Sequence, residues 1–262
     1  MGRRLSSLAG LFGIDIGQGV ATLLALPRFL RDYSVFRSLQ SESGDHPFAM
    51  GKMYPCLADD KENSGTASGA YFHQDLLVAN RVFCNAPQRH VDVGSRIDGF
   101  VAHVACFRQI EVFDIRPLES KLANLLFRQV DMMKQLPAEF VGCSDSVSCL
   151  HALEHFGLGR YGDPIDPDGY LAGLKNLTAL LSCGGTLYLS VPIGRQRVEF
   201  NAHRVFSVEY LLHLFKADYE LIEFSYVDDA GDLSRNVAPT PEEAESSFGC
   251  DYGCGIFELW KR

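Results

Sequence analysis

Three ionisable side chains lie within five residues of one another in the segment 151–155, His-Ala-Leu-Glu-His. The run 146–150 before them predicts a buried strand, and α/β folds place their chemistry at the carboxyl ends of parallel strands. If the chain continued as a helix, His151, Glu154 and His155 would lie at i, i+3 and i+4, on one face. The glycine-rich tail GLGRYGDPIDPDG would end such a helix early, which predicts a loop over a pocket. Imidazoles beside a carboxylate indicate acid–base chemistry or a divalent metal ion, and both alternatives stay open.

The segment 89–117, RHVDVGSRIDGFVAHVACFRQIEVFDIRP, predicts a nucleoside-binding half-site. It divides into a buried strand at 90–93, a glycine-bearing turn at 94–99, a helix at 100–107 and a second strand at 110–113 that ends in Asp114. A strand that ends in small residues lets a ligand approach the backbone, and the following helix presents free N–H groups there. An acid at the tip of the next strand, roughly 20 residues on, can accept hydrogen bonds from a ribose diol.

The spacing of this turn argues against a dinucleotide. The sequence Asp92-Val-Gly94-Ser-Arg-Ile-Asp-Gly99 departs from the G-x-G-x-x-G fingerprint, and Phe100 follows where a phosphate-cradling loop needs Lys. Asp92 would repel a phosphate, but it could bind a positively charged amino group, directly or through water. S-adenosylmethionine has a cationic amino acid end and a ribose, and the stretch resembles the first two motifs of class I methyltransferases. We therefore expect S-adenosylmethionine as the cofactor.

A third acid extends the expected cofactor site. Asp131 follows the predicted strand 127–130, where a carboxylate could accept a hydrogen bond from the exocyclic amine of adenine. The alternative for Asp131 is a helix N-cap, because Asp favours that position too. The residues expected to bind the cofactor are Asp92, Gly94, Ser95, Asp114, Ile115, Asp131 and His151.

The chemistry of methyl transfer suggests which residues face the acceptor. Transfer is an in-line displacement, so the protein must position the acceptor and, for a hydroxyl, remove its proton. His203, in the segment EFNAHRVFS, joins the 151–155 cluster as a candidate base. The expected catalytic residues are His203, His155, His151 and Glu154. The same four side chains are the candidate ligands of a divalent metal ion that would orient and acidify a hydroxyl.

Composition limits the classes of partner. A chain of 262 residues with 47% apolar content can bury a core, and its net charge of −9 argues against nucleic acid as a partner. The eight cysteines are scattered without a C-x-x-C pair, which is typical of free thiols in a reducing compartment. We therefore expect a cytoplasmic protein.

The N-terminal segment differs from the rest of the chain. Residues 1–66 are expected to form a helical extension and a linker, and residues 67–262 the catalytic domain. The apolar run within 1–40 is interrupted by polar residues and is neither a good signal peptide nor a membrane span. It predicts helical packing against the core or a partner, or an interfacial helix that contacts a membrane peripherally. The basic residues that would face lipid headgroups are Arg3, Arg4, Arg28 and Arg31.

The remaining pattern alternates helices and strands, which favours an α/β fold. Helices are expected at 69–86 and 169–181, a helix or turn at about 118–126, and later strands at 186–191, 219–227 and 254–260. The last strand is expected to pair antiparallel beside the sixth at the sheet edge. The polar, acidic segment 228–249 is expected to be mobile.

Five blocks carry a resemblance to a known family. They are HVDVGSRIDGFVAH, LHALEHFGLGRYGDPIDPDG, GGTLYLSVPIG, FNAHRVFS and GCGIFEL. Over about residues 67–260 they resemble the methyltransferase-like family catalogued as domain of unknown function 268. The resemblance implies a Rossmann-like, seven-stranded class I methyltransferase sheet, mostly parallel with an antiparallel seventh strand, helices on both faces, and S-adenosylmethionine at the strand ends. The first motif departs from the tighter G-x-G of many relatives.

A second resemblance bears on the metal alternative. H-x-x-E-H followed by E-F-N-x-H is similar to the metal site of small-RNA 2′-O-methyltransferases, in which E-x-x-E-H and a distant His hold magnesium. His151 replaces the first Glu here, which favours a softer transition metal.

Together these features predict an S-adenosylmethionine-dependent methyltransferase that O-methylates a small polar or saccharide acceptor with a histidine base. The alternatives are an inactive S-adenosylmethionine-binding protein and a metal-assisted O-methyltransferase. A nicotinamide oxidoreductase would need the dinucleotide loop that this sequence lacks.

Overall fold

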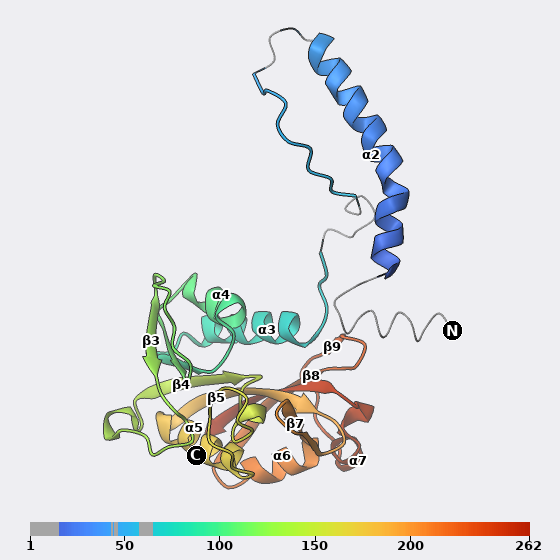
Figure 1. The fold of residues 1–262 in the computed structure, drawn as a ribbon. Coiled ribbons are helices and arrows are strands. Elements are labelled where there is room, and N and C mark those ends of the chain that lie inside the picture. Colours follow the sequence, from blue (N-terminus) through green and yellow to red (C-terminus); the bar gives the residue numbers. More distant parts are fainter. Residues whose placement is uncertain (1–15, 43, 45–46, 58–64) are drawn as a thin grey trace. The chain divides into compact units, whose positions relative to one another are not determined.

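The computed structural model describes residues 16–42, 44, 47–57 and 65–262, and the chain divides into two units, Met1–Thr66 and Ala67–Arg262 (Figure 1). The described part of the first unit holds one long helix, α2 (Ile16–Glu42). Arg3 and Arg4, predicted to face lipid, lie outside the described residues. Across the described ranges, no helix combines the length and the apolar character that crossing a membrane requires.

An eight-stranded sheet organises the second unit, in the order β3-β2-β1-β4-β5-β10-β8-β9. Its strands are β1 (His90–Val93), β2 (Ile110–Asp114), β3 (Leu125–Gln129), β4 (Ser144–Leu150), β5 (Leu181–Ile193), β8 (Tyr219–Val227), β9 (Leu233–Ser234) and β10 (Gly253–Lys261). The first five pair in parallel, so their carboxyl ends meet at one edge. β10 runs antiparallel to both β5 and β8, which confirms the mostly parallel sheet with one reversed long strand.

Two details of the predicted sheet are wrong. The sheet has eight strands rather than seven, because β9 pairs antiparallel with β8 within the segment expected to be mobile. The last long strand, β10, lies between β5 and β8 instead of at the edge, where its seven-residue run Gly253–Leu259 is buried on both faces. A strand with no exposed face gains most from a neighbour on each side.

Helices cover both faces of the sheet (Figure 1). On one face lie α3 (Ala70–Asn85) and α4 (Ala102–Ala105), and on the other α5 (Gly169–Leu180), α6 (Val208–Phe215) and α7 (Pro241–Glu245). The helix α3 forms where the apolar spacing predicted one, and its buried face runs through Gln74, Leu77, Val78, Arg81 and Val82. Of the apolar positions that indicated this helix, Phe72, Leu76 and Phe83 are exposed instead. One buried core packs under α3 and α4, and a second under α5 and α6.

The segments between these elements depart further from the sequence pattern. Of the helix or turn expected at 118–126 the chain forms a turn, and it enters β3 at Leu125, two residues before the predicted strand start. The helix expected at 100–107 is a π-helical turn, Ile97–Val101, followed by the short α4. Within 228–249 the chain forms β9, α7 and the turn Ser247–Gly249. α7 begins at a capping box in which Thr240 and Glu243 bond each other's backbone, so this polar stretch is ordered by its own side chains.

A two-stranded hairpin stands apart from the main sheet. It consists of β6 (Arg197–Glu199) and β7 (His203–Val205). The hairpin follows β5 and returns to it through a bridge between Ile193 and Phe206, and it carries His203 towards the strand ends.

Candidate active site

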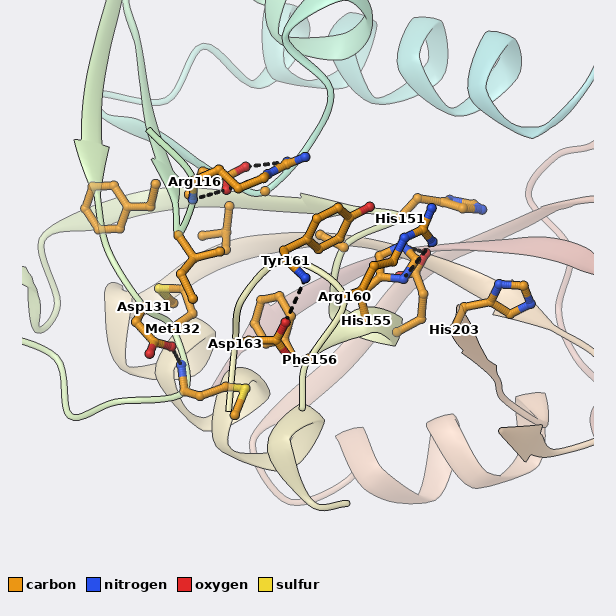
Figure 2. Close-up of a pocket in the computed structure, with 18 of the residues that line it drawn as sticks. Arg116, Asp131, Met132, His151, His155, Phe156, Arg160, Tyr161, Asp163 and His203 are labelled. Carbon is orange, nitrogen blue, oxygen red and sulfur yellow. Dashed lines mark hydrogen bonds and ion pairs between the residues drawn. The ribbon is translucent and has the colours of Figure 1, made fainter. Parts of the chain in front are cut away.

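A cavity of about 380 Å³ opens at the carboxyl ends of β1, β2 and β4. Figure 2 shows its two ends: His151, His155 and His203 lie at one, Asp131 and Met132 at the other, and Tyr161 lies between them. Of the predicted site residues, Asp92 and Ser95 lie outside its wall. Those that line it are Gly94, Asp114, Ile115, Asp131, His151, Glu154, His155 and His203.

The turn after β1 requires glycine. Gly94 has φ +71°, and a Cβ built on it would lie 2.9 Å from Cβ of Ala152. Its N–H donates to the carbonyl of Phe113 at 2.9 Å, which ties the turn to the end of β2. A ligand at this wall of the cavity therefore meets backbone without a side chain.

Asp92 and Ser95 stabilise this turn from outside the cavity wall. The Asp92 carboxyl is fully buried and accepts from Ser95 N–H at 3.1 Å, from Ser95 Oγ at 2.6 Å and from Ser148 Oγ at 2.6 Å. Burial raises the pKa of Asp92 to about 7, against the lowering effect of these hydrogen bonds. Leu150 N–H donates in turn to Ser95 Oγ at 3.1 Å, so β1 and β4 are joined through this acid.

Acids stand at the ends of the next two strands, as predicted. Asp114 ends β2, and both of its carboxylate oxygens accept hydrogen bonds from Arg116. Asp131 lies two residues after β3 and accepts from the backbone N–H of Met133 at 3.0 Å, with Lys134 Nζ at 3.3 Å. Asp131 therefore caps a turn and also lines the cavity.

The 151–155 segment does not form the predicted helical face. His151 has φ +49°, and only Leu153–His155 make a single 3₁₀ turn, so the three side chains diverge. His151 Nδ1 lies 2.8 Å from Gln74 Oε1, whereas His155 Nδ1 lies 2.6 Å from the carbonyl oxygen of Ala202. The left-handed residue at the strand end prevents an α-helix from starting there.

Burial shifts the pKa of each group in this segment. The pKa of His151 is lowered to about 3 and that of His155 to about 4, because burial disfavours the charged imidazole. Burial raises the pKa of Glu154 to about 8. All three side chains are therefore neutral at pH 7, and neither imidazole takes up a proton readily.

His203 has a different environment. Its Nε2 lies 3.1 Å from Glu199 Oε2 across the β6–β7 hairpin, and its ring lies 4.9 Å from that of Tyr252. The Glu199 pKa is lowered, mainly by a hydrogen bond from Arg197, so this carboxylate stays ionised. An ionised carboxylate beside an imidazole stabilises the imidazolium, which suits a proton acceptor.

The glycine-rich tail forms a pinned loop at the cavity, as the sequence predicted. The Asp163 carboxylate accepts from the backbone N–H groups of Gly157, Gly159 and Tyr161 at 2.8 to 3.1 Å. The buried Arg204 donates to four backbone carbonyl oxygens, those of residues 154, 156, 166 and 167. The loop is therefore stabilised by hydrogen bonds to two charged side chains, those of Asp163 and Arg204.

Comparison with known proteins agrees with this architecture. Residues 110–238 match the sequence model of a family described as "Caenorhabditis protein of unknown function, DUF268". This segment is therefore similar to the DUF268 family, in agreement with the resemblance found in the sequence. No curated protein matches the chain by sequence.

Solved structures share the fold of this chain. One is the 1,6-didemethyltoxoflavin-N1-methyltransferase of Burkholderia thailandensis, with 1,6-didemethyltoxoflavin and S-adenosylhomocysteine bound. It is 15% identical in sequence, the match covers 90% of this chain and 88% of that protein, and the TM-score is 0.51. Another is the [4+2]-cyclase SpnF, at 18% identity, 92% and 96% coverage and a TM-score of 0.53. The fold is thus the Rossmann-like class I methyltransferase fold that the sequence predicted.

The metal alternative is not supported. The described residues of the chain contain no group of three or more His, Cys, Asp or Glu side chains placed to hold a metal ion. The candidate set His151, Glu154, His155 and His203 fails because the first histidine turns to Gln74 on α3 and the last to Glu199.

Arg116, Arg160 and Tyr161 are among the cavity residues that sequence reasoning missed. Arg116 and Arg160 lie on the two sides of Tyr161, with guanidinium carbons 4.4 and 5.2 Å from its ring centroid. Arg160 Nη1 also donates to the carbonyl of Ala202 at 3.0 Å. A signal was present, because Arg160 and Tyr161 interrupt the glycine-rich loop that was already predicted to cover the pocket.

Proposed function

We propose that this protein is an S-adenosylmethionine-dependent methyltransferase that acts on a hydroxyl group of a small polar acceptor, such as a saccharide. The observation that carries the proposal is that one cavity has residues suited to bind a nucleoside at one end and histidine side chains at the other. A side-chain-free turn at Gly94 and the acid Asp114 lie at the first, and His203 with its carboxylate partner at the second.

The residues present fit this cofactor. Asp114, at the tip of β2, offers two acceptor oxygens suited to a ribose diol, and Ile115 offers an apolar surface beside it. Asp131 would accept from the adenine amine, and Gly94 would lie against the amino acid end. Asp92 and Ser95 would act through the turn that they hold. When bound, S-adenosylmethionine supplies an electrophilic methyl group.

Among the three cavity histidines, His203 fits the role of base best. His151 and His155 are kept neutral by burial and have low pKa values. His203 stands beside an ionised carboxylate that would stabilise it once protonated. His203 would take the proton of the acceptor hydroxyl, and Glu199 would orient the ring.

Calorimetric titration of the full chain with S-adenosylhomocysteine and, separately, with NAD tests the proposal. We expect micromolar binding of S-adenosylhomocysteine and none of NAD. Binding of NAD alone would refute it. Binding of S-adenosylhomocysteine with no methyl transfer to any of a panel of polyhydroxylated small molecules would instead support the inactive binding protein. The cyclase that shares this fold makes that distinction necessary.

A further inference from the structure

Glu154 lines the cavity with a carboxyl group that the protein does not satisfy. Its side chain is 1% exposed, and among the described residues no group hydrogen-bonds its Oε2. The other oxygen, Oε1, lies 3.5 Å from His155 Nε2. Buried polar groups in native proteins nearly always have a partner, so this oxygen calls for an explanation.

The side chains next to Glu154 form their hydrogen bonds with other groups. His155 Nδ1 faces the carbonyl oxygen of Ala202 at 2.6 Å, and because a carbonyl only accepts, this nitrogen carries the ring proton. In the neutral ring, Nε2 is then an acceptor and gives Glu154 no hydrogen bond. Arg160 donates to the same carbonyl of Ala202, and Arg204 donates to backbone carbonyl oxygens.

The buried carboxyl groups of Asp92 and Glu258 have a donor on each oxygen. Asp92 accepts three hydrogen bonds, and Glu258 pairs with Arg81 at 2.9 Å and with Asn85 at 3.3 Å. Glu154 differs from both because it is at the cavity wall and its Oε2 has no donor among the described residues. A buried acceptor at a cavity wall that lacks a donor is suited to receive one from a ligand.

We propose that Glu154 is a recognition site for an amino or hydroxyl group of a bound ligand, with Oε2 accepting its hydrogen bond. This inference rests on the proposed function, because that function supplies the two possible sources of the group. One is the amino group at the methionine end of the cofactor, and the other is a hydroxyl of the acceptor. In either case Glu154 contributes to binding rather than to the stability of the fold.

Thermal unfolding of Glu154→Met separates a binding role from a structural one. Because the unpaired carboxyl is costly to bury, the apolar variant should unfold at a temperature higher by about 3 °C. The same change at Glu258 is the matched control, and Glu258→Met should unfold at a lower temperature because it leaves Arg81 buried with fewer partners. An unchanged or lower unfolding temperature of Glu154→Met would overturn the proposal.

Calorimetry with two probes distinguishes the sources. S-adenosylhomocysteine carries the amino acid end, and 5′-methylthioadenosine lacks it. If Glu154 binds the cofactor's amino group, Glu154→Met, which removes the acceptor, should lower the affinity for S-adenosylhomocysteine about tenfold and leave that for 5′-methylthioadenosine unchanged. If it binds the acceptor, both affinities stay unchanged. An equal loss of affinity for both probes would indicate a deformed cavity and overturn the proposal. If the wild type binds neither probe, the proposed function is refuted, but the unfolding result can still be interpreted.

Discussion

Asp114 and Arg116 form a bidentate ion pair at the end of β2. The guanidinium donates from Nε to Oδ1 at 3.0 Å and from Nη2 to Oδ2 at 2.7 Å, and the backbone N–H of Arg116 donates to Oδ1 at 2.8 Å. The guanidinium also lies over the ring of Tyr161 in the glycine-rich loop. A ribose diol that binds Asp114 must therefore share this carboxylate with Arg116, which links the cofactor site to the loop.

Replacing Asp114 tests its assigned role. Asp114→Ala should lower the affinity for S-adenosylhomocysteine at least about tenfold, because charge-assisted hydrogen bonds to the ribose are lost. Calorimetric titration of the wild type and the variant measures the change. An affinity within about twofold of the wild type would contradict the assignment of the ribose to this acid.

The chain provides a matched control for this change. Asp98 is paired with Arg96 at the same two-residue spacing, through Nε at 3.1 Å and Nη2 at 2.8 Å, but it does not line the main cavity. Asp98→Ala should leave the affinity unchanged. If it reduced binding as much as Asp114→Ala does, the loss would reflect a broken ion pair near the cavity and not a lost ligand contact.

Substitution of His203 tests the proposed base. His203→Asn should slow methyl transfer to any acceptor that the wild type methylates by about 100-fold, with unchanged affinity for S-adenosylhomocysteine. Glu199→Gln should slow it less, since the imidazole remains, and should shift the pH profile of the rate. His213→Asn, in the last turn of α6 and outside the cavity, serves as the control. Full activity of His203→Asn, with loss in His155→Asn, would assign the base to His155.

Much of the sheet follows from local patterns. The predicted bounds 90–93 and 219–227 coincide with β1 and β8, because each is a short run rich in apolar residues that ends at a turn or polar segment. The acids Asp114 and Asp131 were found because parallel strands bring their carboxyl ends to the same edge. The position of β10 could not be predicted, since the order of antiparallel strands depends on long-range pairing.

The parts of the site that were missed depend on contacts between distant segments. Asp92 lies on the buried strand β1 and accepts a hydrogen bond from Ser148 on β4, and Glu154 Oε2 lacks a donor while His155 donates to the carbonyl of Ala202 in the hairpin. His151 turns towards Gln74 on α3, which also accepts from Ser190 Oγ at 2.6 Å. Spacing along the chain carries no information on these partners, so it predicted a shared face that the structure does not form.

The buried carboxyl groups predict how stability depends on pH. Burial raises the pKa of Asp92 to about 7 and that of Glu154 to about 8, whereas both would ionise near their ordinary values in the unfolded chain. Above those ordinary values the folded protein holds more protons, so stability falls as pH rises until each folded pKa is passed. The lowered pKa values of His90 and His151, about 3, have the opposite effect, but only below about pH 6.5, the ordinary histidine value.

Between pH 6.5 and 8 the carboxyl effect therefore stands alone. The free energy of unfolding should decrease there by up to about 1.4 kcal/mol per pH unit for each carboxyl, measured by denaturant titration. Asp92→Asn should flatten this slope because it removes one of the two titrations, whatever its effect on absolute stability. Asp98→Asn should not, since the hydrogen bond from Arg96 lowers the pKa of Asp98 and this exposed carboxylate is ionised in both states. An unchanged slope in Asp92→Asn would show that this acid is ionised in the folded protein, its charge stabilised by the hydrogen bonds from Ser95 and Ser148.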